Sequence, residues 1–195
     1  EHILSYIVFI PLVGALVVLL TPKAYQHLYK VLVIGSTGLS LLLTLYAVHM
    51  FDGGLVPQIS GEANLQLVEK VEWFRLSLGS LGTFSVDYLL AADGLNISML
   101  LLASIVLFIG AIACWKIKEK QKAYFGLYLL LSTSVLGCFV ALDFFLFYLF
   151  FEFMLLPMYF LVGLWGGPRR EYAAIKFFIY TLVGSILILI VMIGL

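Results

Sequence analysis

The chain has 195 residues, of which 64% are hydrophobic and 11% are charged, and its mean hydropathy is +1.14. Its 11 acidic and 11 basic side chains are too few to cover the surface of a soluble core of this size. A soluble globular protein is therefore excluded, and the composition indicates an integral membrane protein. The net charge of zero also argues against a nucleic-acid partner, because phosphate binding requires clustered Lys and Arg side chains.

Six segments are long and apolar enough to cross a bilayer, for which a helix needs about 20 residues. The sequence thus predicts an all-α integral membrane protein with six transmembrane helices in a single domain over residues 1–195. Asp143 alone separates the fourth and fifth spans. The chain ends within apolar sequence, which suggests the N-terminal part of a longer chain. The predicted spans are 3–20, 31–51, 95–115, 123–142, 144–165 and 173–195.

Basic residues predict the orientation of these spans. Most of them lie in the first, third and fifth connections, and connections rich in Lys and Arg face the cytoplasm. We therefore expect the N-terminus on the periplasmic side of a bacterial inner membrane. The basic residues concerned are Lys23, Lys30, Lys116, Lys118, Lys120, Lys122, Arg169 and Arg170.

The second connection, residues 52–94, is rich in acidic residues and is the longest segment outside the spans. Apolar and polar residues alternate over 74–78 and again over 84–88, with two glycines in 79–82 between them. This pattern predicts a short periplasmic β-hairpin between the second and third helices. Because a lone hairpin is only marginally stable in water, we expect its apolar face to pack on the membrane domain or on a neighbouring subunit.

Glu152 is the charged residue that needs a special explanation. It lies about 12 Å into the fifth span at about 1.5 Å per residue, and therefore near the bilayer midplane. A charged side chain there costs about 2.5–3.5 kcal/mol to insert, so it normally faces a bundle interior or a water-filled cavity. Burial favours the neutral carboxyl and an opposing lysine favours the charged one. The sequence therefore predicts a proton relay, and the alternative is a structural hydrogen bond between helices.

Other residues of the last two spans could assist Glu152. Pro157 removes a backbone hydrogen bond close to it and is expected to kink the helix. Lys176, near the cytoplasmic end of the sixth span, either serves the relay or snorkels to the interface. Glu152 lies about 20 Å from the cytoplasmic end of its own helix, so a direct ion pair with Lys176 is geometrically poor. Tyr148 and Tyr159 are further candidates for the proton path.

The segment 147–185 resembles the fifth and sixth helices of chain M, also called chain 4, of the proton-pumping NADH-quinone oxidoreductase (respiratory complex I). The resemblance lies in FEFMLLPMYFLVGLWG and YAAIKFFIYTLVGS, and DGLN at 93–96 is similar to the start of that family's third helix. It implies that the chain is part of a larger antiporter-like helix bundle with inverted repeats. In that bundle, Glu152 is the essential midmembrane carboxylate, Lys176 contributes to cytoplasmic access, and the central lysines lie on later helices.

The resemblance also implies a function: a proton-translocating antiporter-like subunit, coupled to quinone reduction elsewhere in the complex. The sequence has no GxGxxG motif, and Cys114 and Cys138 lack the spacing of a metal or Fe–S site. We therefore expect no cofactor in this chain, and NADH, FMN, Fe–S clusters and quinone in other subunits. The expected partners are other membrane subunits of the complex, including neighbouring antiporter-like subunits, and the lipid bilayer.

Two other functions are compatible with the residues. A subunit of a multisubunit sodium/proton antiporter would share the midmembrane carboxylate. A noncatalytic membrane scaffold would use Glu152 only to tie helices together, and would tolerate its replacement by Gln.

Overall fold

The protein is described by a computed structural model that covers residues 2–22, 26–51, 65–77 and 83–194. This part of the chain contains six α-helices, each long and apolar enough to cross a membrane, and one pair of β-strands. In chain order the elements are α1 (Ile3–Leu20), α2 (Gln26–Met50), β1 (Gln66–Ser77), β2 (Thr83–Ala92), α3 (Asn96–Ala113), the short 3-10 helix η2 (Cys114–Lys116), α4 (Gln121–Val140), α5 (Phe144–Trp165) and α6 (Arg170–Gly194).

The helices agree with the predicted spans, with differences at their ends. Helices α1 and α5 have the predicted bounds. Helix α2 begins at Gln26 rather than at residue 31, and α6 begins at Arg170 rather than at residue 173. Hydropathy marks the part of a helix that lies in hydrocarbon, whereas backbone hydrogen bonding continues through polar residues at the interface.

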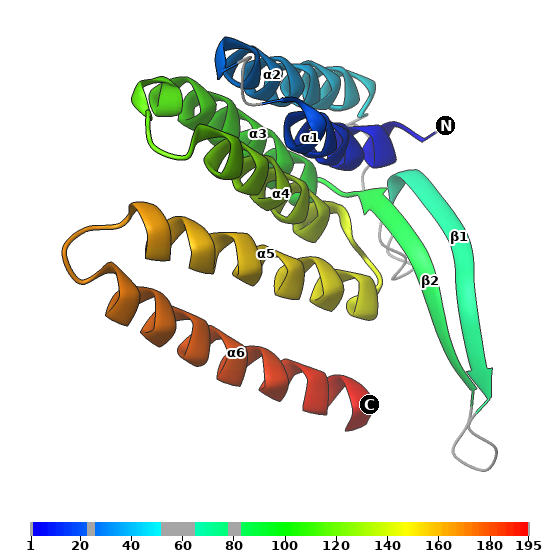
Figure 1. Cartoon of the computed structure of the whole chain (residues 1–195). Coiled ribbons are helices and arrows are strands. Elements are labelled where there is room, and N and C mark those ends of the chain that lie inside the picture. Colours follow the sequence, from blue (N-terminus) through cyan, green and yellow to red (C-terminus); the bar gives the residue numbers. More distant parts are fainter. Residues whose placement is uncertain (1, 23–25, 52–64, 78–82, 195) are drawn as a thin grey trace.

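Helices α1 to α4 pack together around one apolar core, and α5 and α6 extend this group on one side (Figure 1). Helix α5 packs on α4 and α6 packs on α5, so that α6 lies at the edge. Among the described side chains of α6, only Ala174 and Ser185 are buried. The large side chains that are fully buried between α1, α2, α3 and α4 include Leu4, Ile7, Tyr29, Leu100, Phe125, Leu129 and Leu136.

Close packing against α4 sets the rotation of α5 about its own axis. The ring of Phe150 lies over Gly137, where a Cβ atom would come within 2.5 Å of the ring. Phe150 is buried, so its side of α5 is the one that faces α4. Residues two apart differ by about 200° around a helix, and Glu152 therefore projects away from α4.

Strands β1 and β2 form an antiparallel pair, in register from Gln66 opposite Ala92 to Ser77 opposite Thr83, with two irregularities in β1. The alternation of apolar and polar residues therefore predicted this strand pair correctly, although both strands extend beyond the predicted runs. The expected turn at 79–82 lies outside the described residues.

Hydrogen bonds hold the base of the hairpin against the helix ends. The Leu142 N–H donates to the Leu89 carbonyl at 3.0 Å, which links the α4–α5 connection to β2. The Asn96 side chain donates to the Ala91 carbonyl at 2.9 Å, so that α3 starts directly from the end of β2. The hairpin thus lies at the end of the molecule where α1, α3 and α5 begin (Figure 1).

Candidate functional site

Glu152 lies in the middle of α5. This helix begins after Asp143, whose carboxylate accepts a hydrogen bond from the Leu146 N–H at 2.9 Å. It then continues as one α-helix through Pro157 to Trp165. Glu152 lies about 12 Å from the start of α5 at about 1.5 Å per residue, which is close to the centre of a membrane span.

One face of α5 carries a groove of about 320 Å³ that contains Glu152. Its walls are mostly apolar, and Leu149, Phe153 and Leu156 are exposed beside the carboxylate. Oε1 of Glu152 is buried and has no hydrogen-bond partner among the described residues. An unpaired oxygen in apolar surroundings is costly when ionised, so it can bind a proton or accept a hydrogen bond from a group that enters the groove. The groove is lined by Phe145, Tyr148, Leu149, Glu152, Phe153 and Leu156.

Tyr148 lies one turn before Glu152 on α5 and lines the same groove. Residues four apart share one face of a helix, so the structure places Tyr148 beside Glu152, as helical spacing allows. On α6, the side chain of Ser185 is only 1% exposed, and its hydroxyl donates to the Leu182 carbonyl of the same helix at 2.9 Å.

Lys176 lies on α6 and does not line the Glu152 groove. Its side chain is exposed, and Nζ lies 5.7 Å from the ring centroid of Tyr172 and 5.8 Å from that of Tyr180. Among the described residues there is no ion pair between Lys176 and Glu152, in agreement with their expected separation. Tyr159, the other candidate for the proton path, does not line the groove either.

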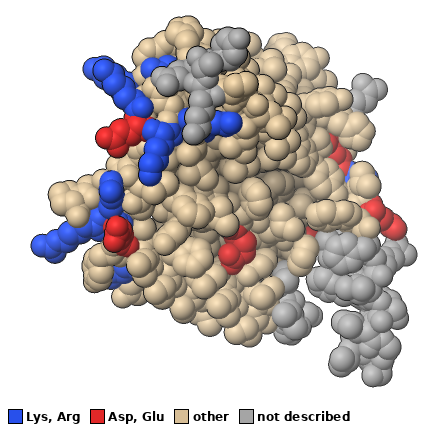
Figure 2. All heavy atoms as spheres, in the orientation of Figure 1, with Lys and Arg blue, Asp and Glu red and all other residues tan. Residues whose placement is uncertain are grey.

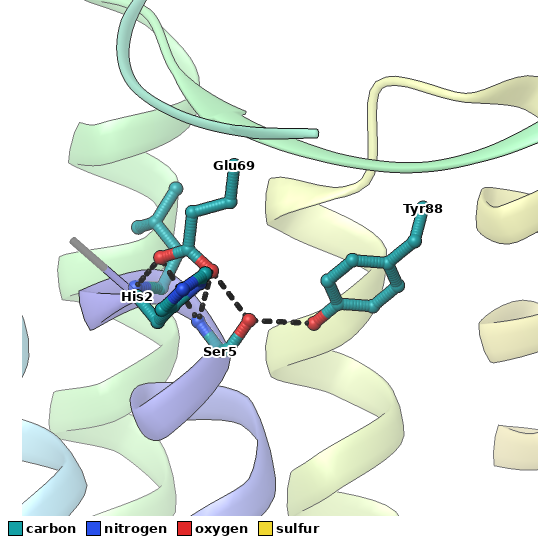
Figure 3. Close-up of polar contacts among 5 residues, drawn as sticks. His2, Ser5, Glu69 and Tyr88 are labelled. Carbon is teal, nitrogen blue, oxygen red and sulfur yellow. Dashed lines mark hydrogen bonds and ion pairs between the residues drawn. The ribbon is translucent and has the colours of Figure 1, made fainter. Parts of the chain in front are cut away.

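Another carboxylate, that of the buried Glu69 on β1, lies against the start of α1 (Figure 3). Its Oε1 accepts hydrogen bonds from the N–H groups of Leu4 at 2.7 Å and Ser5 at 3.4 Å, and its Oε2 accepts from the Ser5 hydroxyl. His2 lies beside it, with Nδ1 3.7 Å from Oε2. First-turn N–H groups lack partners within a helix and favour negative charge. Glu69 therefore caps α1 and ties the hairpin to the membrane helices.

The Glu69 contact extends to the second strand. The Ser5 hydroxyl lies 2.8 Å from the Tyr88 hydroxyl on β2, toward which it points in Figure 3. Burial raises the pKa of Tyr88, the hydrogen bond with Ser5 lowers it, and the nearby charge of Glu69 raises it, so that the net change is upward. Tyr88 therefore stays protonated at neutral pH and can donate to Ser5.

The role of Glu69 could not be predicted from the sequence, where it is one of several acidic residues in the second connection. One sequence feature could have indicated this role: Glu69 lies two residues after Leu67 on the strand and therefore on the same face, and Leu67 packs against the core. That signal is weak, because Leu67 itself has a positive φ of 54° and the strand pairing is irregular between Gln66 and Glu69.

Basic side chains gather at the end of the molecule opposite the hairpin (Figure 2). Polar contacts join the helix ends there: Lys30 Nζ donates to the Trp115 carbonyl at 2.7 Å, and Trp165 Nε1 donates to the Glu119 carbonyl at 3.0 Å. Within the described part of the chain, no three His, Cys, Asp or Glu side chains are placed to hold a metal ion together.

The C-terminal part of the chain, which contains Glu152, matches a known family. Residues 141–195, which include Tyr148, Glu152, Lys176 and Ser185, match the family described as NADH:quinone oxidoreductase/Mrp antiporter, TM. Over 100% of its length the chain is 32% identical to NADH-quinone oxidoreductase subunit M of Rhodobacter capsulatus, of which it covers 36%. It is also 37% identical, over 98% of its length, to the F(420)H(2) dehydrogenase subunit M of Methanosarcina mazei, of which it covers 36%.

A solved structure shares the fold. The chain superimposes on part of respiratory complex I from Thermus thermophilus with a TM-score of 0.70 and 28% sequence identity, over 93% of this chain and 33% of that one. The chain spans about a third of the length of the relatives it matches. With its six apolar helices it is a multi-pass membrane protein. Residues 141–195 thus belong to the NADH:quinone oxidoreductase/Mrp antiporter family, and the chain as a whole is similar to membrane subunits of this kind.

Proposed function

We propose that this chain is part of a proton-translocating subunit of an NADH-quinone oxidoreductase complex, and that Glu152 gains and loses the transported proton. The observation that supports this proposal most directly is the buried, unpaired Oε1 of Glu152 in the middle of a membrane span. The resemblance to subunit M and the family match over 141–195 supply the type of complex.

The groove gives Glu152 the environment that a proton carrier needs. A carboxyl in apolar surroundings favours its neutral form, and a nearby cation favours the charged form. A basic group that approaches Oε1 through the groove would release the proton, and its withdrawal would restore the neutral carboxyl. Because Lys176 does not line the groove, we assign this role to a basic group from outside the described helices.

Lys176 has a secondary role in this proposal. It is exposed between the rings of Tyr172 and Tyr180, in the half of α6 nearer the basic end of the molecule. We place this end at the cytoplasmic face of a bacterial inner membrane and the N-terminus with the hairpin at the periplasmic face, because basic connections stay inside. In this orientation Lys176 contributes to proton access from the cytoplasm.

The redox chemistry is assigned to other subunits. NADH oxidation and quinone reduction, with FMN and Fe–S clusters as cofactors, would take place outside this chain and drive proton movement within it. Two relatives support this assignment: one is named a subunit of an NADH-quinone oxidoreductase and the other a subunit of an F(420)H(2) dehydrogenase. Because similar subunits occur in complexes with different electron donors, we infer that this type of subunit does not itself bind the donor. Neighbouring antiporter-like subunits are the expected partners, with the hairpin as one contact.

Replacement of Glu152 by Gln in the assembled complex tests the proposal. Gln keeps the size of the side chain but cannot release a proton, so proton translocation should fall by about 100-fold or more, the range typical of a lost acid–base group. Assembly, measured by native electrophoresis, should be unchanged. Translocation at the normal rate in the assembled Glu152→Gln complex would leave the noncatalytic scaffold as the better function.

The main alternative is a subunit of a multisubunit sodium/proton antiporter, because the matched family includes Mrp antiporters. Such a subunit would share the carboxylate in the groove. Ion flux in proteoliposomes separates the two functions: transport that requires sodium and no electron donor supports the antiporter, whereas transport that requires electron transfer supports the oxidoreductase.

A further inference from the structure

A pocket of about 470 Å³ lies at the basic end of the molecule, between the end of α1, the start of α2 and the connection that leads into α4. Its volume is in the range of sites that hold small ligands, about 300–1,000 Å³. On one wall, Leu19 of α1 packs on Gly126 of α4, where an added Cβ atom would lie 3.2 Å from the leucine side chain. The lining residues include three lysines, Lys118, Lys120 and Lys122, together with Leu19, Tyr29 and Ala123.

The three lysines give this pocket a positive charge, which no acidic residue among its described lining residues offsets. Lys118 and Lys120 are exposed, and Lys122 is partly buried. Within the described part of the chain none of the three forms an ion pair. Glu119 belongs to the same connection but does not line the pocket. The pocket therefore favours an anion, to which the ammonium groups can donate hydrogen bonds.

Hydrogen bonds fix the backbone that carries these lysines. The Gln121 side chain donates to the Ile117 carbonyl at 2.9 Å, which closes the connection just before α4. Trp165 Nε1 at the end of α5 donates to the Glu119 carbonyl at 3.0 Å. The connection is thus ordered before a ligand arrives, and this order lowers the conformational entropy that binding must remove.

The surface beside the pocket fits a lipid better than a soluble anion. Leu19, Leu16 and Val13 follow one another at three-residue spacing along α1, and all three are exposed. Residues three apart are neighbours on the surface of a helix, so these side chains form an apolar strip from the pocket toward the middle of the span. An acyl chain can lie along this strip while its phosphate group lies at the lysines.

We propose that this pocket binds the phosphate headgroup of an anionic phospholipid, such as phosphatidylglycerol, with Lys118, Lys120 and Lys122 around the phosphate. Basic pockets between membrane helices at the cytoplasmic side bind anionic headgroups of this kind. In the orientation proposed above, the pocket lies at that side. The bound lipid joins the ends of α1, α2 and α4 there. This inference makes no use of Glu152 and is independent of its proposed role.

Photocrosslinking in the assembled complex tests the inference. A photoreactive p-benzoylphenylalanine in place of Leu19 stands in the wall of the pocket, and mass spectrometry of the α1 peptide identifies the molecule that it captures. The complex is reconstituted in phosphatidylcholine vesicles that contain a minor fraction of phosphatidylglycerol. We expect the captured lipid to be enriched in phosphatidylglycerol over the vesicle composition. The same probe in place of Ile112, which is exposed near the end of α3 and does not line the pocket, should show no such enrichment.

The lysines offer test variants and a matched control. Lys122→Gln should reduce the enrichment about 5-fold, the factor expected for one lysine near an anionic surface. Replacement of all three pocket lysines by Gln should return the captured lipid to the vesicle composition, whereas replacement of all three by Arg, which keeps the charge, should preserve the enrichment. Lys116 belongs to the same connection but does not line the pocket. Lys116→Gln removes the same charge and should leave the enrichment close to that of the wild type.

The results that would overturn the inference are distinct. Capture of both lipids in the vesicle ratio by the wild type, or unchanged enrichment in Lys122→Gln and in the triple Gln variant, would leave the lysines as topology anchors. Crosslinking of the Leu19 probe to another subunit would show that protein covers the pocket. A greater loss of lipid capture with inorganic phosphate than with chloride of the same ionic strength would assign the pocket to free phosphate. None of these results affects the proposed function, which Glu152→Gln tests.

Discussion

Glu69 is a buried residue and Glu152 is partly buried, and the two carboxylates have opposite surroundings. Glu69 accepts hydrogen bonds at both of its oxygens, from the N–H groups of Leu4 and Ser5 and from the Ser5 hydroxyl. Glu152 has a buried oxygen with no partner among the described residues and lies in a mostly apolar groove. Both residues are glutamates, but only Glu69 has hydrogen-bond donors for both carboxylate oxygens within the described part of the chain.

This difference separates a structural acid from a candidate functional one. A carboxylate whose two oxygens both accept hydrogen bonds stabilises the contact it makes. Burial of a carboxylate oxygen without a hydrogen-bond partner has a desolvation cost that no contact in the fold offsets. Such unpaired groups persist in proteins where function requires them. We therefore expect substitutions at Glu69 to change stability and substitutions at Glu152 to change transport.

The largest expected effect is that Glu152→Gln and Glu69→Gln change different properties of the complex. Glu152→Gln should reduce proton translocation by about 100-fold or more, while the thermal stability of the complex stays close to wild type. Glu69→Gln should do the reverse, with normal translocation per assembled complex and lower stability. Translocation assays and thermal denaturation on both variants provide the measurement. Equal loss of translocation in the two variants would break the distinction between them.

The next effect concerns the contact that Glu69 makes. In Glu69→Ala the N–H groups of Leu4 and Ser5 lose their acceptors, at a cost of about 2 kcal/mol. Hydrogen exchange at the Leu4 amide should therefore be about 30-fold faster, since 1.36 kcal/mol corresponds to a factor of about ten. The Ser36 hydroxyl bonds within α2 and serves as a control through Ser36→Ala, which should leave exchange at Leu4 unchanged. Wild-type exchange at Leu4 in Glu69→Ala would contradict the capping role.

A smaller effect tests the packing that turns Glu152 away from α4. Gly137→Ala brings a methyl group to 2.5 Å from the Phe150 ring and should destabilise the α4–α5 contact by about 1–3 kcal/mol. In Gly163→Ala the new methyl group meets Ala174 at an ordinary 3.5 Å, so this variant is the matched control. Thermal denaturation of the complex compares the two. Equal stability of both variants would show that Phe150 does not fix the rotation of α5.

Lys176→Gln should have the smallest effect. The ammonium lies between two aromatic rings, a contact worth about 0.5–1 kcal/mol at an exposed site, and it does not line the Glu152 groove. Translocation should therefore fall by no more than about 5-fold, the factor that corresponds to this energy. A loss as large as that of Glu152→Gln would place Lys176 in the central relay and change the comparison with Glu69.

The membrane helices could be predicted from the sequence because each is a long apolar stretch that polar residues precede. Asp143 shows this clearly, since its side chain caps α5 at the predicted position. The start of α2 could not be predicted in the same way, because Gln26, His27 and Lys30 are polar and helical at once. Their helical state depends on the continuation of backbone hydrogen bonds, to which hydropathy is insensitive.

The candidate site could be predicted only in part, for a related reason. Glu152 is conspicuous because it is a charge within apolar sequence, and Tyr148 follows from helical spacing. Glu69 and its partner Leu4, by contrast, are 65 residues apart. Contacts of this kind arise from tertiary packing and leave no local pattern in the sequence.

The central claim is that Glu152 changes its protonation state during turnover. Time-resolved infrared spectroscopy on the assembled complex, with electron transfer as the trigger, measures this directly. We predict a carboxyl band that appears and disappears with each turnover in the wild type and in Glu69→Gln, and that is missing in Glu152→Gln. The same transient carboxyl band in Glu152→Gln, or its absence from the active wild-type complex, would contradict the claim.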